Sequence, residues 1–382
     1  MNTPKSLALA AILLAMGSPA ALAQIRIGAT LAETGPAGAL GDPEAKTLRL
    51  LVEQINAAGG VLGEPLELVL YDDGGDPNNA RTYATRLVEH DEVVAIIGGT
   101  TTGTSLAIRS VAEDEEIPFI SLAGGIEIID PVHPFTFKTP HTDRMACEKI
   151  FEDMQAQGIT RIGMISGTDG FGASMRNQCL GVAAGYGIEI AADERYAPGD
   201  ADMVPQLTNI RNTEGVQAVL NPGFGAGPAI VTRNYRQLGI ELPFYQSHGV
   251  AGQAYIDLSG AENAEGVRLP GTALLIADQL TEDDAQRAVV TAYRDAYVGR
   301  YNEPVSTFGG YAHDALAILV DAITRNGEAD PDPVDLRDAI EATAGLVGTT
   351  GTYSFAADDH LGLDLTAFRL LQIQGGTWSE TP

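Results

Sequence analysis

The feature of this chain that most restricts its fold is a repeated alternation of strand-like and helix-like segments. Strand patterns separated by helical patterns occur in two series, first at 25–30, 66–71, 93–97 and 118–121 and then at 161–166, 187–191, 216–220 and 243–246. Strands separated by helices of this length form parallel sheets that helices cover on both faces. The sequence therefore predicts an α/β fold made of two doubly wound parallel-sheet units.

The last third of the chain breaks this alternation. Helical patterns follow one another at 285–301, 311–325 and 334–343, and two strand-like segments come after them. No repeat of fixed period and no low-complexity linker separates the two series. A chain of 382 residues is long enough for two domains of ordinary length. We therefore expect two lobes that are joined by several crossings of the chain.

Two Asp-Pro pairs mark expected helix starts. Asp42 and Asp76 can cap a helix with their carboxylates, and each is followed directly by a proline. A proline at the first helical position lacks only an N–H that has no helical partner there. We expect helices to begin at Pro43 and at Pro77.

Residues 1–23 have the pattern of a secretory signal peptide. Lys5 precedes an apolar run at 7–16, and the small residues at 21–23 suit cleavage. The run is too short to span a bilayer, and no later stretch approaches the roughly 20 apolar residues that spanning requires. We expect a periplasmic protein that starts at Gln24 and does not insert into the membrane. Because no cysteine follows the cleavage site, we expect no lipid anchor.

The net charge of −28 excludes some partners. A chain this acidic repels nucleic acid and anionic lipid, so we expect neither as a ligand. The simplest interpretation is a well-solvated surface that stays soluble in salt. The alternative is an acidic surface that attracts a cationic ligand.

The chain has two cysteines, Cys147 and Cys179. In an exported protein, a single pair of cysteines favours a disulfide over two free thiols. Both residues lie in helical patterns, so the bridge requires those two helices to be neighbours. We expect no metal site, because no His or Cys stands at ligand spacing beside either cysteine.

Glycine, threonine and serine gather where the predicted strands end. These stretches lie at 98–104, 121–125, 167–172, 221–227 and 247–249, with a further glycine-rich loop after the first strand. In open parallel sheets, ligands bind at the carboxyl ends of the strands, where the next helix offers free N–H groups. Each stretch taken alone can be an ordinary turn. Together they predict one cleft that binds a carboxylate.

Signatures of catalysis are missing from the sequence. It contains no G-x-G-x-x-G after the first strand, no G-x-x-x-x-G-K-[ST] and no G-x-S-x-G. We therefore expect no enzyme activity and no cofactor. The alternative from this class is an extracellular hydrolase that uses Ser247 with His248, or the Asp72-Asp73 pair.

Three stretches resemble the periplasmic solute-binding proteins of ABC importers, in particular the leucine/isoleucine/valine-binding type. They read IRIGATLAETGPAGALGD, then EQINAAGGVLGEPLELVLYDDGGDP, then VVAIIGG followed by IPFIS. The resemblance covers the whole chain after the signal peptide. It implies two doubly wound lobes, a hinge of three crossings, and delivery of a trapped ligand to permease and ATPase subunits at the inner membrane. A sensing subunit that reports to a receptor is the alternative role.

The resemblance also implies boundaries for the lobes. The first lobe would comprise 24–139 and 275–348, and the second 140–274 and 349–382. Such proteins close about their hinge when a ligand contacts both lobes, because the ligand has a higher affinity for the closed form.

Site residues are implied by matching the family position by position. The hydroxyl that holds the ligand carboxylate matches Thr102, with Thr101 beside it. The loop after the fourth strand matches Ala123, Gly124 and Gly125, so the threonine of the family is missing there. An aromatic residue of the first loop is replaced by Leu40. The aromatic residues of the second lobe match Phe171 and Phe224.

Other interpretations of these residues stay open. Thr102 can be a helix cap, Phe171 and Phe224 can be core residues, and His248 can be a hinge residue bonded to backbone. His141 and Arg144, just after the first predicted crossing, are further candidates for an anion contact.

The largest departure from the family is at His248. In the amino-acid binders a glutamate at this position holds the ligand's ammonium group, and a buried ammonium without such a partner is costly. Histidine can donate a hydrogen bond but supplies no fixed negative charge. The stretches TFKTPHTDRMACEKIFEDM, ISGTDGFG, YQSHGV and STFGGYAHDA also resemble a branch associated with aromatic carboxylates. Our hypothesis is therefore a small aromatic or related carboxylic acid as ligand. A branched-chain amino acid is the alternative.

Overall fold

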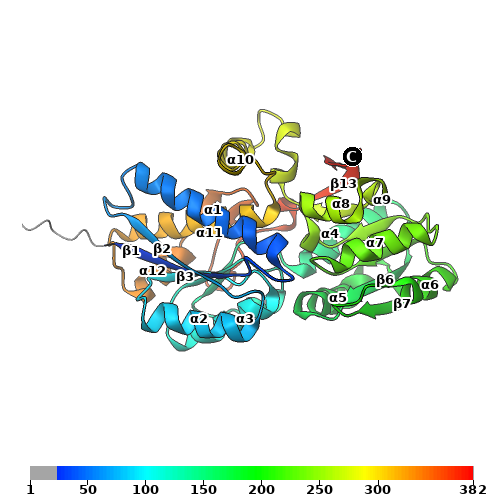
Figure 1. The fold of residues 1–382 in the computed structure, drawn as a ribbon, viewed down its shortest axis with the longest axis horizontal. Coiled ribbons are helices and arrows are strands. Elements are labelled where there is room, and N and C mark those ends of the chain that lie inside the picture. Colours follow the sequence, from blue (N-terminus) through cyan, green and yellow to red (C-terminus); the bar gives the residue numbers. More distant parts are fainter. Residues whose placement is uncertain (1–23, 382) are drawn as a thin grey trace, which may run out of the picture.

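The computed structural model describes residues 24–381, so the expected signal peptide at 1–23 lies outside the described residues. Two sheets, each flanked by helices, form two lobes that lie side by side (Figure 1). No helix between residues 24 and 381 combines the length and the apolar character needed to cross a membrane. The predicted α/β class and the two doubly wound lobes are confirmed.

The first sheet is entirely parallel, with the strand order β2-β1-β3-β4-β5. Its strands are β1 (Ile25–Leu31), β2 (Leu66–Asp72), β3 (Ala95–Gly98), β4 (Phe119–Ser121) and β5 (Thr136–Lys138). The helices of this lobe are α1 (Gly38–Ala57), α2 (Pro77–Glu89), α3 (Thr102–Asp114), α11 (Thr307–Asn326) and α12 (Pro333–Glu341). The three central strands are almost wholly buried because helices cover both of their faces.

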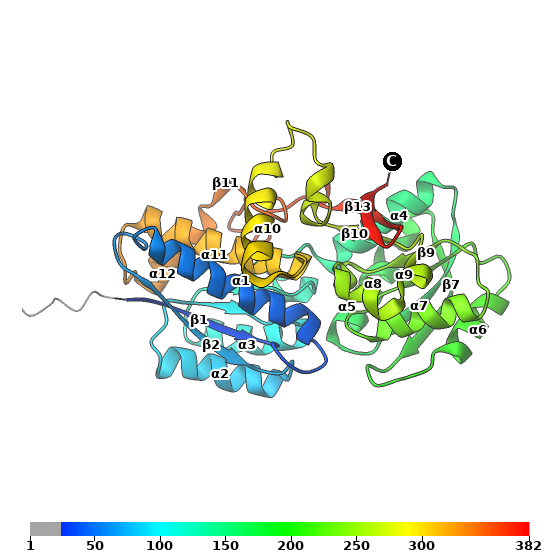
Figure 2. The ribbon, with the colours of Figure 1, turned by 45° about the horizontal axis from the view of Figure 1, so that its top comes forward.

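The second sheet has the order β14-β13-β10-β9-β8-β6-β7. Its strands are β6 (Arg161–Gly167), β7 (Glu189–Tyr196), β8 (Ala218–Asn221), β9 (Phe244–Gln246), β10 (Arg268–Gly271), β13 (Arg369–Gln374) and β14 (Thr377–Glu380). The first five run parallel, whereas β13 pairs antiparallel with both β10 and β14. Figure 2 shows β13 beside β10. This lobe therefore adds an antiparallel edge to the predicted parallel sheet.

The remaining helices cover the second sheet or lie beside the crossings. They are α4 (Asp143–Ala156), α5 (Gly170–Val182), α6 (Val204–Asn212), α7 (Gly227–Gln237), α8 (Gln253–Ser259), α9 (Ala261–Ala264) and α10 (Arg287–Tyr301). A separate hairpin consists of β11 (Ala344–Val347) and β12 (Thr352–Ser354).

Hydrogen bonds tie the segments that pass between the lobes. The chain leaves the first sheet after β5, returns to pack α11 against α1, and leaves again after β12 to form β13. At this junction the Thr139 hydroxyl donates to the Tyr311 carbonyl at 3.0 Å, and the Tyr353 hydroxyl donates to the Thr139 carbonyl at 2.9 Å. The proposed boundaries between the lobes lie between residues 139 and 140, 274 and 275, and 348 and 349.

One of the two expected helix starts is correct. Asp76 caps α2 by accepting from the N–H of Asn78 at 2.7 Å, and Pro77 is the first helical residue. The other prediction is wrong, because α1 already begins at Gly38 and contains Pro43. Burial of Leu40 on the first turn of α1 accounts for the earlier start, and Asp42 instead forms an ion pair with Lys46.

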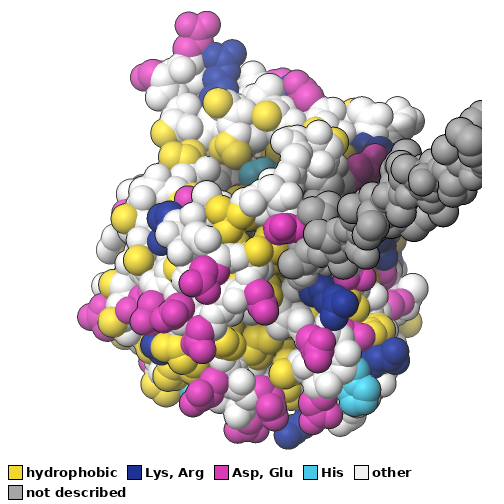
Figure 3. Space-filling model, turned by 90° about the vertical axis from the view of Figure 1, so that its left-hand side faces the viewer, with side chains coloured by type: hydrophobic (Ala, Val, Ile, Leu, Met, Phe, Trp, Pro, Cys, Tyr) yellow, Lys and Arg dark blue, Asp and Glu magenta, His cyan; other side chains and the backbone are white. Residues whose placement is uncertain are grey.

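The acidic side chains are spread over the surface. Figure 3 shows Asp and Glu scattered over the end of the first lobe, with Lys and Arg between them. The chain has 51 acidic and 23 basic residues, so these side chains repel each other across much of the surface. This distribution is that of a solvated surface.

The two cysteines join neighbouring helices of the second lobe. Cys147 on α4 and Cys179 on α5 form a disulfide, with Cα atoms 5.1 Å apart. Both residues are fully buried. The bridge closes a loop of sequence separation 32, which restricts the unfolded chain.

Replacing both Cys147 and Cys179 by alanine should lower the free energy of unfolding by about 2–4 kcal/mol, the loss expected for a loop of this length. Urea unfolding of the two proteins measures the difference. As a control, a reductant should destabilise the wild type and leave the double variant unchanged. Equal stability of wild type and variant would show that the bridge contributes nothing.

Candidate functional site

The carboxyl ends of strands from both sheets face a small buried cavity between the lobes. We call it the inner cavity, and its volume is about 30 Å³. Its walls are formed by Leu40, Thr100, Thr101, Thr102, Leu122, Ala123, Gly124, Pro140, Phe171, Phe224, His248, Gly249, Phe308 and Tyr311. The structure thus brings most of the predicted site residues to one place. It does so through parallel sheet topology, which directs strand ends of both lobes into the same gap.

Three consecutive threonines at the start of α3 have different roles. Thr101 is the helix cap, and its hydroxyl accepts from the N–H of Thr104 at 3.2 Å. Thr100 donates to a carboxyl oxygen of Glu44 at 2.6 Å and accepts from the N–H of Ala32 at 3.0 Å. The Oγ1 atom of Thr102 is buried and has no hydrogen-bond partner among residues 24–381. Capping therefore falls to Thr101, which leaves Thr102 free for a ligand.

The loop after β4 brings backbone close to the opposite lobe. A Cβ on Gly124 would lie 2.6 Å from Nε2 of His248 and 2.8 Å from a ring carbon of Phe171. Gly125 does not line the inner cavity. It packs against Thr102 instead, where a Cβ would lie 2.5 Å from Cγ2. Small residues are needed here because the two lobes touch at this loop.

Aromatic rings form the second-lobe wall. Phe171 lies in the first turn of α5, and its ring meets Phe224 edge-to-face with centroids 6.3 Å apart. The same ring lies 5.3 Å from the imidazole of His248, again edge-to-face. Phe171 is 5 % exposed and Phe224 is partly buried, so both pack against the core and also face the cavity.

His248 is held in place without a bond to its ring. It is 2 % exposed, and neither Nδ1 nor Nε2 has a hydrogen-bond partner within the described chain. The neighbouring Ser247 fixes the backbone, since its hydroxyl donates to the Gly223 carbonyl and accepts from the N–H of Gly249. Burial, assisted by the charge of Lys138, lowers the pKa of His248 to about 3. The imidazole is therefore neutral at pH 7 and offers one donor and one acceptor.

Residues from the crossings, which the sequence did not indicate, also reach the cavity. Tyr311 and Phe308 come from the first turns of α11, and Pro140 follows β5. The Tyr311 hydroxyl is buried and has no partner among the described residues. The available signal was the STFGGYAHDA stretch, in which Gly309 and Gly310 allow α11 to approach its neighbours closely.

Two predicted candidates lie outside the inner cavity. His141 is fully buried and stacks on Phe368, with ring centroids 3.5 Å apart. Arg144 is exposed, and its Nε donates to the side chain of Gln178 at 3.1 Å. Neither side chain lines the cavity, so the structure does not support either as a contact for an anion there.

The groups of the hydrolase alternative are occupied elsewhere. Asp72 accepts from the hydroxyl of Thr34 at 2.7 Å, and Asp73 accepts from the hydroxyl of Thr30 at 3.0 Å. Ser247 bonds to backbone and not to His248. Within residues 24–381 no group of His, Cys, Asp and Glu could hold a metal ion.

The electrostatic environment of the inner cavity suits an anion. No Asp or Glu is among its lining residues. Glu44 lies behind Thr100, and burial raises its pKa well above the usual range, which favours the uncharged acid. Lys138 is buried nearby, and burial lowers its pKa to about 7 against the opposing charges of Asp143 and Glu127. The N-terminus of α3 adds the positive end of a helix dipole.

Two lobes with a cavity between them, lined by rings and a few polar groups, define a class of proteins that close around a small ligand. The family model that describes the periplasmic binding protein matches residues 24–377. This chain belongs to the periplasmic binding protein family. The resemblance seen in the sequence is thereby confirmed.

Two relatives of this chain are named for the amino acids that they bind. The leucine-, isoleucine-, valine-, threonine- and alanine-binding protein of Pseudomonas aeruginosa is 26% identical over 306 residues, covering 79% of this chain and 78% of that protein. The leucine-specific-binding protein of Salmonella typhimurium is 24% identical and covers 85% of each chain.

Two solved structures share this fold over almost the whole chain. An extracellular ligand-binding receptor from Rhodopseudomonas palustris has a TM-score of 0.87 at 26% identity, covering 94% of this chain and all of that one. The branched-chain amino acid transporter substrate binding protein of Streptococcus pneumoniae, solved with isoleucine, has a TM-score of 0.82 at 24% identity, covering 94% and 98%. The second of these likenesses supports the fold alone.

Replacing Gly124 by alanine should weaken ligand binding by about 1–3 kcal/mol, because the added methyl forces His248 and Phe171 away from the first lobe. Calorimetric titration with leucine and with benzoate measures the change. Gly181→Ala on α5 is the matched control, since a Cβ there meets nothing within 4 Å. Full affinity in Gly124→Ala would show that the lobes do not need this close contact.

Proposed function

We propose that this protein is the solute-binding component of an ABC importer, which captures a small carboxylate in the periplasm and delivers it to the permease and ATPase subunits. One observation carries the proposal. Thr102, Tyr311 and His248 bring buried polar groups without partners in the described chain to a single cavity between the lobes. A ligand that satisfies groups of both lobes stabilises their closed arrangement, which the permease then recognises.

A branched-chain amino acid is the ligand class that the relatives favour. Two of the matched proteins are named for binding leucine. The carboxylate would accept from Thr102 and the α3 N-terminus, and the side chain would lie against Phe171 and Phe224. These names support this ligand better than the aromatic acid that the sequence suggested.

A carboxylic acid without an α-amino group is the second candidate, for one specific reason. The inner cavity has no Asp or Glu in its lining, and His248 is neutral, so an ammonium would lack a charged partner. The rings of Phe171, Phe224 and Phe308 provide flat apolar surface for an aromatic ring.

Titration of the purified protein with leucine and with benzoate should distinguish the two candidates. In either case Thr102→Val should cost about 1–3 kcal/mol of binding free energy, because the carboxylate loses a buried donor. Thr82→Val on the exposed face of α2 is the control and should bind normally. Binding of neither acid by the wild type would refute the proposed function, and normal binding by Thr102→Val would remove this residue from the site.

The variant His248→Glu should have opposite effects on the two candidates. A glutamate gives an ammonium its missing partner, so the affinity for leucine should rise. The negative charge of the glutamate repels the carboxylate of benzoate, so the affinity for benzoate should fall by about 1–3 kcal/mol or more. His248→Gln, which keeps a neutral donor and acceptor, is the control. Identical affinities in all three proteins would place His248 outside the site.

A further inference from the structure

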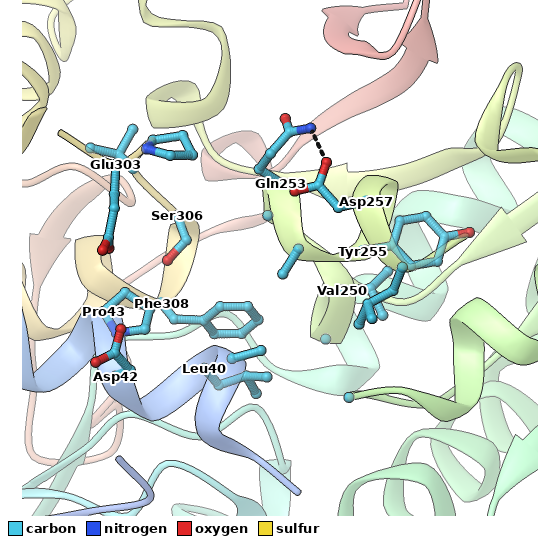
Figure 4. A pocket seen from close by; sticks show the side chains of 18 of the residues that line it. Leu40, Asp42, Pro43, Val250, Gln253, Tyr255, Asp257, Glu303, Ser306 and Phe308 are labelled. Carbon is cyan, nitrogen blue, oxygen red and sulfur yellow. Dashed lines mark hydrogen bonds between the residues drawn. The ribbon is translucent and has the colours of Figure 1, made fainter. Parts of the chain in front are cut away.

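A second and much larger cavity continues from the inner one. We call it the outer compartment, and its volume is about 270 Å³. Leu40, Gly249 and Phe308 line both cavities, so these residues form the passage between them. Figure 4 shows the Phe308 ring at the centre of the compartment, close to Leu40.

The inner cavity is too small to hold the whole of an elongated ligand. A cavity of about 30 Å³ holds roughly two water molecules, since one water needs about 10–15 Å³ by this measure. A carboxylate group fits in that space, but the whole of an elongated acid does not. The far end of an elongated acid bound at Thr102 must therefore pass Phe308 into the outer compartment.

The walls of the outer compartment come from both lobes. On one side are the first turns of α1, with Ala39 and Asp42, and the segment 303–308 that leads into α11. On the other side are residues 249–258, which include α8. A molecule in this compartment therefore contacts both lobes and stabilises their closed arrangement.

The polar groups of the outer compartment are acidic. Asp42 and Glu303 share one cation, because Lys46 lies 2.7 Å from a carboxylate oxygen of each. Asp257 faces them from the other lobe, and within residues 24–381 its side chain bonds only to the amide of Gln253, at 3.0 Å (Figure 4). Two of these three negative charges are thus unbalanced, and no Lys or Arg is among the lining residues.

We propose that the outer compartment is a specificity subsite for the far end of an elongated carboxylic acid. The acid head lies in the inner cavity, an apolar spacer passes Phe308, and a hydroxyl or amino group at the far end donates to the acidic walls. A second carboxylate at that end is rejected by Asp42, Glu303 and Asp257. The inference rests on the proposed function and adds the shape and polarity of the ligand.

The test compares short and extended acids that have the same head group. Leucine is paired with tyrosine, and benzoate with 3-(4-hydroxyphenyl)propanoate, so the test holds for either ligand candidate. For the head group that the protein accepts, the extended acid should bind at least about tenfold more tightly. Its ring is removed from water when it enters the outer compartment. Replacing its hydroxyl by a carboxylate, as in 3-(4-carboxyphenyl)propanoate or 4-carboxyphenylalanine, should abolish the gain.

Two variants fill the compartment from opposite lobes. Ala39→Trp on α1 and Ala254→Trp on α8 introduce a large ring at exposed lining positions. Each should lower the affinity for the extended acid at least about tenfold and leave the short acid nearly unchanged, because only the extended acid enters the filled space. Ala57→Trp, at the exposed far end of α1, is the matched control and should bind both acids normally.

The outcomes separate this inference from the proposed function. If the short acid binds as tightly as the extended one and tolerates both tryptophans, the outer compartment is not a subsite, although the solute-binding function stands. If the carboxylate-ended probe binds best, the assigned polarity is wrong. If none of the acids binds, the proposed function fails and the inference fails with it.

Discussion

The structure depends on one constraint, which is that polar groups of both lobes are buried around one cavity. Thr102 and Tyr311 from the first lobe meet His248 from the second, and none of their side-chain polar atoms has a partner among the described residues. Each buried group left unpaired costs about 1–3 kcal/mol. In the proposed function, closure is unfavourable unless a ligand supplies the partners, which would couple ligand capture to hinge movement.

The gap between the lobes contains two regions that differ in charge. The inner cavity combines a helix N-terminus, a neutral imidazole and a nearby buried lysine, without acidic lining residues. The outer compartment has carboxylates on both walls. A ligand with an acid at one end and a donor at the other therefore has one preferred orientation, in a protein whose surface repels anions in general. The local field of the inner cavity has to overcome that repulsion.

The sequence predicted what depends on short-range pattern. Alternation revealed both parallel sheets, Asp76-Pro77 revealed the start of α2, and the loops at 98–104, 121–125 and 247–249 indicated where the lobes meet. Long-range packing decided the rest. Phe308 and Tyr311 were missed because they reach the cavity through a crossing, and Arg144 was misplaced because its direction depends on α5. Burial of Leu40 likewise started α1 before Pro43.

The most direct measurement is a crystal structure of the protein with the ligand that co-purifies with it. The account predicts that an acid group of the ligand is bonded to the hydroxyls of Thr102 and Tyr311, that the far end of an elongated ligand lies beyond Phe308, and that His248 bonds to the ligand as a neutral ring. A ligand ammonium bound by a carboxylate that reaches into the inner cavity, or a ligand that leaves Thr102 and His248 without partners, would contradict the account.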